Sequence, residues 1–152
     1  MSQIKIKEAL FRHCELFVKK RTETVQEIIS SNQKALQSET KSSAGDKHET
    51  GRAMLQLEME KASQQLEGIA IMNQILSKIV IAKSGEVGHL GSIIITDKAN
   101  YFLSISAGQL VAEGKNYFAI SVSSPIGKLL LGKRKNEVVV FNGNQIKIIQ
   151  IL

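Results

Sequence analysis

Apolar residues recur at helical spacing along the first part of the chain. From about Lys7 to Glu39 they include steps of three and four positions, which are typical of a helix, and this segment contains neither Pro nor Gly. The apolar stripe is narrow and polar residues cover the rest, which is typical of a helix that packs against one other helix. Its apolar members are Leu10, Cys14, Phe17, Val18, Val25, Ile28, Ile29, Ala35 and Leu36.

A second helical pattern covers about Glu49 to Ile79. Its apolar positions alternate between steps of three and four residues, as in a coiled coil, and Gly68 interrupts this pattern. Because the connection between the two segments is short, we expect antiparallel neighbours in a helical hairpin. The apolar members are Leu55, Met59, Ala62, Leu66, Ile69, Met72, Leu76 and Ile79.

The turn between these helices carries two carboxylates, Asp46 and Glu49, three residues apart. One interpretation is structural: Ser43 or Asp46 caps the second helix, and Glu49 lies in its first turn, where the helix dipole favours an acid. The other is chemical. Two carboxylates are a poor metal site alone, but Mg²⁺ commonly binds one or two carboxylates together with phosphate oxygens. A second macromolecule could supply those oxygens, as in two-metal phosphodiester chemistry.

The pattern changes from helical to strand-like at about residue 80. Runs rich in Ile, Val, Phe and Tyr alternate with Gly, Asn, Asp and Ser, and Asn142-Gly143 is a hairpin signal. Ser123–Lys133 reads as one short helix with Pro125 at its first turn. We therefore predict an α+β protein, with a coiled-coil hairpin over 1–80 and an antiparallel sheet with one short helix over 81–152. The expected strands cover 92–96, 101–106, 117–122, 137–141 and 145–152.

Charge and cysteine content narrow the classes of function. The 152 residues carry a formal net charge of +6, with 12 Lys/Arg and 10 Asp/Glu over 1–80 and 8 and 4 over 81–152. This mild excess is compatible with an acidic or nucleic-acid partner, and also with ordinary surface lysines. The single cysteine, Cys14, lies on an apolar stripe and is expected to be a small core residue. A signal-peptide pattern and a membrane-length apolar run are both lacking, so a cytoplasmic protein is expected.

Other chemistry finds little support in the sequence. Gly85, Gly88 and Gly91 are regularly spaced but lack the strand, helix and Lys-Ser/Thr of a phosphate-binding loop. His13 and His48 lie in different segments, and neither is at metal-ligand spacing from Cys14 or from His89. No stably bound cofactor or small-molecule substrate is expected.

Two segments resemble the bacterial Gre transcript cleavage factors, GreA and GreB. Gly45–Thr50, with the helix that follows, resembles the Gre tip, where a Gly-Asp-x-x-Glu-Asn run joins two helices. Ser123–Lys133, followed by Asn136–Val138, is similar to the Ser-Pro…Leu-x-Gly-Lys…Val stretch of the Gre C-terminal domain. The order and sizes of the segments fit over nearly the whole chain.

The resemblance implies an FKBP-like C-terminal domain that docks on RNA polymerase at its secondary channel. It also implies that the hairpin enters this channel and that the tip acids, at Asp46 and Glu49, help to hold a catalytic Mg²⁺ and the attacking water. The polymerase then cleaves the 3′ end of a backtracked nascent RNA, so the factor is not itself an enzyme. The residues that match the docking-domain signature are Ser124, Pro125, Leu130, Gly132 and Lys133.

Family members also use basic hairpin residues to contact RNA, and Lys19, Lys20 and Arg21 form such a cluster here. A solvated charged face is the alternative for these three. DNA binding is a further expectation that the resemblance implies. The tip departs from the family at Lys47, His48, Thr50, Gly51 and Arg52. Cations beside the acids weaken Mg²⁺ affinity or contact phosphate.

Two alternatives follow from these departures and from the implied fold. One is a Gre-like regulator that occupies the same channel without promoting cleavage. The other is a prolyl isomerase, for which an FKBP-like domain would need an aromatic-lined pocket. The aromatic residues available to the second domain are Tyr101, Phe102, Tyr117, Phe118 and Phe141.

Overall fold

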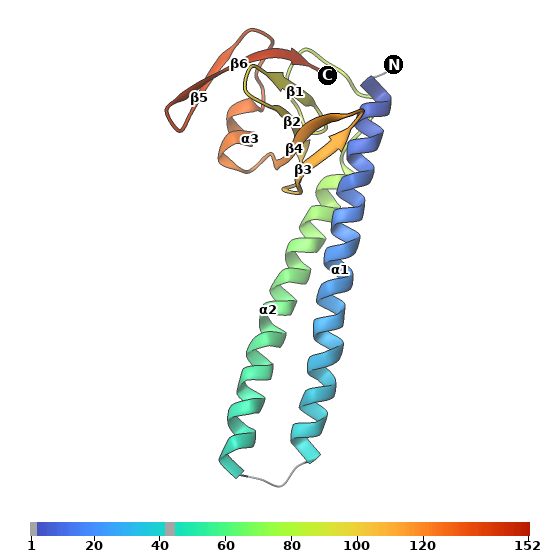
Figure 1. Cartoon of the computed structure of the whole chain (residues 1–152), viewed down its shortest axis with the longest axis vertical. Helices are drawn as coiled ribbons and strands as arrows, with labels where there is room; N and C mark the ends of the chain where they lie inside the picture. Colours follow the sequence, from blue (N-terminus) through green and yellow to red (C-terminus); the bar gives the residue numbers. More distant parts are fainter. Residues whose placement is uncertain (1–2, 42–44) are drawn as a thin grey trace. The chain divides into compact units, whose positions relative to one another are not determined.

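The computed structural model describes the chain over residues 3–41 and 45–152, and side chains over 3–38 and 50–152. It divides into two compact units. The hairpin unit is Val18–Asn73, and the globular unit combines Met1–Phe17 with Gln74–Leu152. The elements are α1 (Gln3–Lys41), α2 (Gly45–Ser77), β1 (Ile93–Thr96), β2 (Asn100–Ser104), β3 (Gly108–Ala112), β4 (Lys115–Ser121), α3 (Pro125–Leu130), β5 (Val138–Phe141) and β6 (Asn144–Ile151) (Figure 1).

The hairpin unit is built on the predicted apolar seam. Val25 on α1 and Ala62 on α2 are each 1% exposed, and Ile28 of α1 lies against Ala62 and its neighbours on α2. Because the helices lie side by side and only three residues separate them, they run antiparallel (Figure 1). Within the hairpin unit, every predicted α2 seam position is buried or half-buried, which confirms the helical hairpin.

The α1 seam differs from the prediction at two positions. Asn32 is 7% exposed and follows Val18 and Val25 at seven-residue intervals, so it occupies a seam position that an apolar search overlooks. Ile28 was predicted to lie on the apolar stripe, but its side chain is 39% exposed. A single apolar residue at the margin of a two-helix seam stays partly in water, because no third element covers it.

The globular unit contains a six-stranded sheet in the order β3-β4-β2-β1-β6-β5. The predicted α+β class is confirmed, but the sheet is mixed and not wholly antiparallel, because β2 pairs with β4 in parallel. The reason is β3, which the sequence pattern did not predict. It forms an antiparallel hairpin with β4 at the sheet edge, and as a result β4 runs in the same direction as β2. Its residues, Gly-Gln-Leu-Val-Ala, lack the Ile and aromatic content of the other strands.

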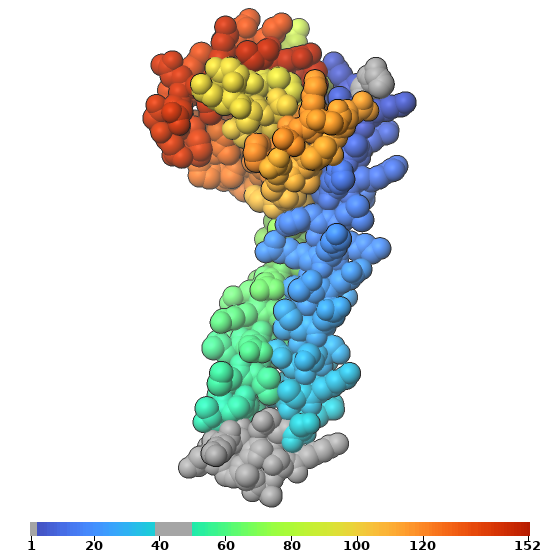
Figure 2. All heavy atoms as spheres, in the orientation of Figure 1, coloured from blue at the N-terminus to red at the C-terminus, as the bar shows by residue number. Residues whose placement is uncertain are grey.

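Each face of the sheet has its own cover. On one face, α3 contributes Leu130 to a core with Ile94 and Leu103 from the central strands. Successive strand residues point to opposite faces, so Phe102 and Ser104 belong to the other face. The first turns of α1 lie against the globular unit (Figure 2), and the Cys14 sulfur lies 3.7 Å from the Ser104 hydroxyl, which places them on that face. The part of α1 that precedes Val18 therefore belongs to the globular unit.

Candidate functional site

The tip acids lie at the start of the second helix of the hairpin. Asp46 and Glu49 are the second and fifth residues of α2, so their backbones follow the connection between the helices directly. Residues three apart share one face of a helix. The side chains of Asp46, Lys47, His48 and Glu49 lie outside the described residues.

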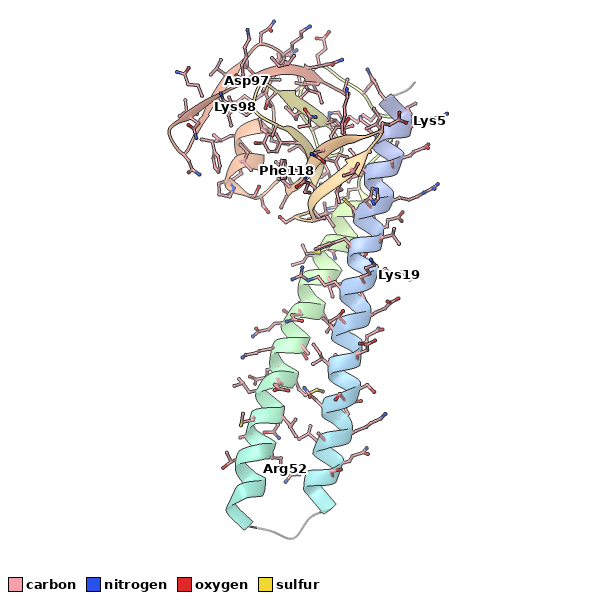
Figure 3. All side chains as sticks on the ribbon, in the orientation of Figure 1. Lys5, Lys19, Arg52, Asp97, Lys98 and Phe118 are labelled. Atoms are coloured by element: carbon pink, nitrogen blue, oxygen red, sulfur yellow. The ribbon has the colours of Figure 1, made fainter. Side chains whose placement is uncertain are left out.

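Two further tip residues fall within the described part of the chain. Thr50 and Arg52 are both exposed on α2, and Arg52 is labelled in Figure 3. Over the described residues, no group of three or more His, Cys, Asp or Glu side chains could hold a metal ion. A resident metal site away from the tip therefore finds no support in the described side chains.

The basic cluster Lys19–Arg21 lies on α1, directly after the seam residue Val18. All three side chains are exposed, and Lys19 extends from α1 in Figure 3. Consecutive helical residues are rotated by about 100° from one another, so these cations span about 200° of the helix surface. One flat strand of nucleic acid could reach only part of this cluster at a time.

The docking signature surrounds α3, and two of its residues hold the helix start. Ser124 is the N-cap: its hydroxyl accepts a hydrogen bond from the Gly127 amide at 3.1 Å and donates one to the Ser121 carbonyl at 2.6 Å. Pro125 follows at the first helical position, where a missing N–H is harmless. A Cβ at Gly127 would overlap the Ser121 carbonyl oxygen, so only glycine fits there. The predicted short helix is confirmed.

The other signature residues divide between core and surface. Leu130 is fully buried in the core, and Gly132 adopts a φ of 81°, which favours glycine after the helix. Lys133 is half-buried, whereas Pro125 is exposed. Ser124, Leu130 and Gly132 therefore shape this loop, and Pro125 and Lys133 are the members that a partner could touch.

Sequence reasoning missed a clamp that fixes this loop from the other side. Gly88 donates from its amide to the Lys133 carbonyl at 2.8 Å and accepts from the Gly132 amide at 2.8 Å. A Cβ at Gly88 would lie 2.6 Å from the Leu130 carbonyl oxygen, which excludes any larger residue without a backbone shift. The glycine spacing at 85–91 was visible in the sequence, but nothing in it revealed this long-range partner.

The aromatic residues of the globular unit do not line one common surface. Phe102 and Tyr117 are buried at 0% and 2% exposure on the face that α1 covers. Tyr101 and Phe118 belong to the opposite face, where their ring centroids are 6.3 Å apart. The sheet itself separates the two pairs, so this arrangement gives the isomerase alternative no support.

The units also differ in charge. The hairpin unit contains 8 Lys/Arg and 8 Asp/Glu, whereas the globular unit contains 12 and 6. The whole formal excess of +6 therefore lies in the globular unit. A division of the sequence at residue 80 gives +2 and +4 because it counts residues 1–17 (net +1) and Lys78 (+1), which belong to the globular unit, with the hairpin.

Comparisons with known proteins found similarity among solved structures. No family model matches the chain, and no curated protein matches its sequence. Among solved structures, the chain is similar to the transcription factor Gfh1, with 21% sequence identity over 94% of this chain and 93% of that one and a TM-score of 0.35. At this TM-score the similarity carries no functional argument. No helix in the described residues is both long and apolar enough for a membrane span.

Proposed function

We propose that this chain is a Gre-type transcription factor that binds RNA polymerase and stimulates its cleavage of backtracked transcripts. The observation that carries the proposal is the hairpin, whose second helix begins at the two acids. Its helices contain 39 and 33 residues, which corresponds to about 58 Å and about 50 Å of helix at 1.5 Å per residue. Two long helices that pack only against each other do not enclose an active site, but they can carry the acids at their tip into a partner protein. The chain therefore acts on a reaction centre in its partner.

Asp46 and Glu49 are the residues proposed to act at that centre. Carboxylate oxygens are the ligands that Mg²⁺ prefers, and two of them leave most of the coordination sphere to water and to the polymerase. The donor set therefore fits a metal shared with a partner. When bound, such an ion stabilises the charge that develops on the transferring phosphate. The carboxylates themselves would orient a water molecule by accepting its hydrogen bonds.

The globular unit is proposed to provide the docking surface. Pro125 and Lys133 lie at the surface of a loop that is fixed by the Ser124 cap and by the Gly88 clamp. A loop held on both sides keeps its shape when the partner is absent, so docking loses little conformational entropy. This rigidity supports the assignment of recognition to the α3 loop and of chemistry to the tip.

A regulator without cleavage activity is the second candidate. Lys47, His48 and Arg52 place basic groups in the sequence around Asp46 and Glu49, and Arg52 is exposed on α2. Positive charge near two carboxylates competes with a divalent cation for them. Such a protein would enter the channel and alter pausing or initiation without any requirement for the acids.

The test uses a stalled, backtracked elongation complex of the host RNA polymerase with Mg²⁺. The full-length protein is expected to accelerate release of 3′ RNA fragments. Asp46→Asn and Glu49→Gln are each expected to reduce that rate by roughly 10²-fold or more while polymerase binding persists, because each preserves size and removes charge. Glu58→Gln, an exposed acid further along α2, serves as the control and should cleave like the wild type.

The outcomes separate the two candidates. Binding without cleavage by the wild-type protein would favour the regulator, as would cleavage that is unaffected by both tip substitutions. If the protein fails to co-purify with RNA polymerase, both candidates are wrong.

A further inference from the structure

An open cleft of about 380 Å³ lies in the globular unit, and none of the α3 signature residues lines it. The segment before β1 contributes Gly85 and Glu86, the turn before β5 contributes Arg134 and Lys135, and the end of β6 contributes Gln150 and Ile151. Two adjacent cations face a single carboxylate in this lining. The cleft is therefore a candidate site for an anion.

The cations stand on a fixed backbone. Arg134 forms an isolated β-bridge with Val87, and its amide donates to the Glu137 carboxylate at 2.6 Å. The Gly88 clamp holds the preceding residue, Lys133. Because the backbone is held on both sides, a ligand would not have to order this turn on binding.

The cationic groups retain most of their hydrogen-bonding capacity. Arg134 makes one ion pair in the cleft, with Glu86 at 3.4 Å, and the two side chains are 61% and 90% exposed. So exposed a pair contributes little to stability and can be displaced by a stronger anion. A guanidinium offers five N–H donors in a fork that suits phosphate. Lys135 is exposed, and within the described part of the chain its ammonium group has no partner.

We propose that this cleft binds the phosphodiester backbone of a nucleic-acid strand, with Arg134 and Lys135 as the phosphate contacts. The location of the whole net charge of +6 in the globular unit supports a polyanion. Ile151 is the one apolar side chain of the lining and is half-buried. An acidic protein partner would need a larger apolar centre to the interface. The site is independent of the proposed polymerase function.

The test measures fluorescence anisotropy of labelled single-stranded RNA, about 20 nucleotides long, and of a duplex DNA of equal length, with the full chain and no polymerase. The comparison of RNA with DNA shows which of the two nucleic acids supplies the phosphodiester backbone. Arg134→Gln combined with Lys135→Gln is expected to weaken binding on the order of tenfold. The slope of log affinity against log salt should fall by about 0.7 to 0.9 for each lost phosphate contact. Circular dichroism shows whether the double variant folds.

Two matched controls isolate the cleft from general charge. Lys98→Gln combined with Lys115→Gln removes the same charge from exposed positions outside the cleft lining and should change affinity much less. Glu86→Gln should tighten binding several-fold, because it removes the carboxylate that competes for Arg134. Glu113→Gln makes the same change of charge elsewhere and should have a smaller effect.

Three results would overturn the proposal. One is an equal loss of affinity in both double variants, which would assign binding to net charge alone. Another is binding of a polyglutamate peptide that matches the nucleic acids in strength and in its response to the variants, which would point to an acidic protein. The third is no measurable nucleic-acid binding at low salt. Since polymerase is absent, none of these results bears on the cleavage proposal.

Discussion

The sulfur of Cys14 lies 3.7 Å from the hydroxyl oxygen of Ser104, a residue 90 positions further along the chain. Cys14 belongs to α1 and Ser104 ends β2, so this contact joins the N-terminal helix to the centre of the sheet. Both side chains are fully buried. Burial raises the pKa of the Cys14 thiol to about 11, and the negative charge of Glu15 adds to this, while the bond to Ser104 opposes it.

The Cys14 thiol should therefore be inert in the folded protein. At about pH 8 a thiol with a pKa of about 11 is almost entirely protonated, and the thiolate is the reactive form. A disulfide reagent such as DTNB is expected to modify the native protein far more slowly than the protein unfolded in guanidinium. Rapid modification of the native protein at this pH would contradict the burial of this residue.

Lys7 should give the protein a pH-dependent stability at alkaline pH. The residue is 3% exposed, its ammonium group donates to the Lys83 carbonyl at 2.9 Å, and desolvation lowers its pKa in the folded state. The unfolded chain therefore binds more protons between the folded pKa and 10.5, so stability rises with pH across that window.

Urea denaturation from neutral pH up to pH 10.5 measures this effect. Lys7→Met should flatten the rise that the wild type shows, since its side chain is of similar length and carries no charge. Lys5→Met is the control, because Lys5 is exposed on the same helix (Figure 3). Identical pH profiles for wild type and Lys7→Met would refute the prediction.

Gly88→Ala should destabilise the globular unit by about 1 to 3 kcal/mol, because the added methyl group meets a backbone oxygen that cannot move by itself. The nearest atoms to this Cβ are the Leu130 oxygen at 2.6 Å and the Ile94 Cδ1 at 3.3 Å. Gly85→Ala is the matched control: no atom lies within 4 Å of its Cβ, so the change should stay within about 0.5 kcal/mol. Thermal unfolding of both variants compares them directly.

Asn32→Leu should stabilise the hairpin by about 1 to 2 kcal/mol. The side-chain nitrogen of Asn32 is buried without a hydrogen-bond partner among the described residues, and such a group loses its hydration without compensation. Asn73→Leu, at an exposed position of α2, should show no comparable gain. Denaturant unfolding followed by helical circular dichroism measures both. A loss of stability in Asn32→Leu would mean that the seam depends on this amide for its register.

The sequence predicted those parts of the fold that rest on local signals. The α2 seam could be read residue by residue, because a steady alternation of three- and four-residue steps is typical of a helix in a coiled coil. The α3 helix was also predictable, since Ser124, Pro125 and Gly132 each favour one position relative to a helix. Five of the six strands followed from β-branched and aromatic runs.

The missing features depend on contacts between distant residues. An apolar stripe looks the same whether it faces a helix or a sheet, so Leu10 and Cys14 gave no sign that they cover the sheet. The Gly88 clamp and the cleft at Arg134 each join segments that are far apart in the sequence. At the tip, Asp46 and Glu49 were identified by resemblance and spacing, and their role awaits the cleavage assay.

Because residues 1–17 belong to the globular unit, the hairpin and the globular unit can complete their folding at different times during protein synthesis. These residues are translated well before the strands that share their unit, which begin at Ile93. The hairpin can form in between, since its contacts are closer in sequence. The apolar residues around Leu10 thus stay exposed to solvent until the strands from Ile93 onward have been translated.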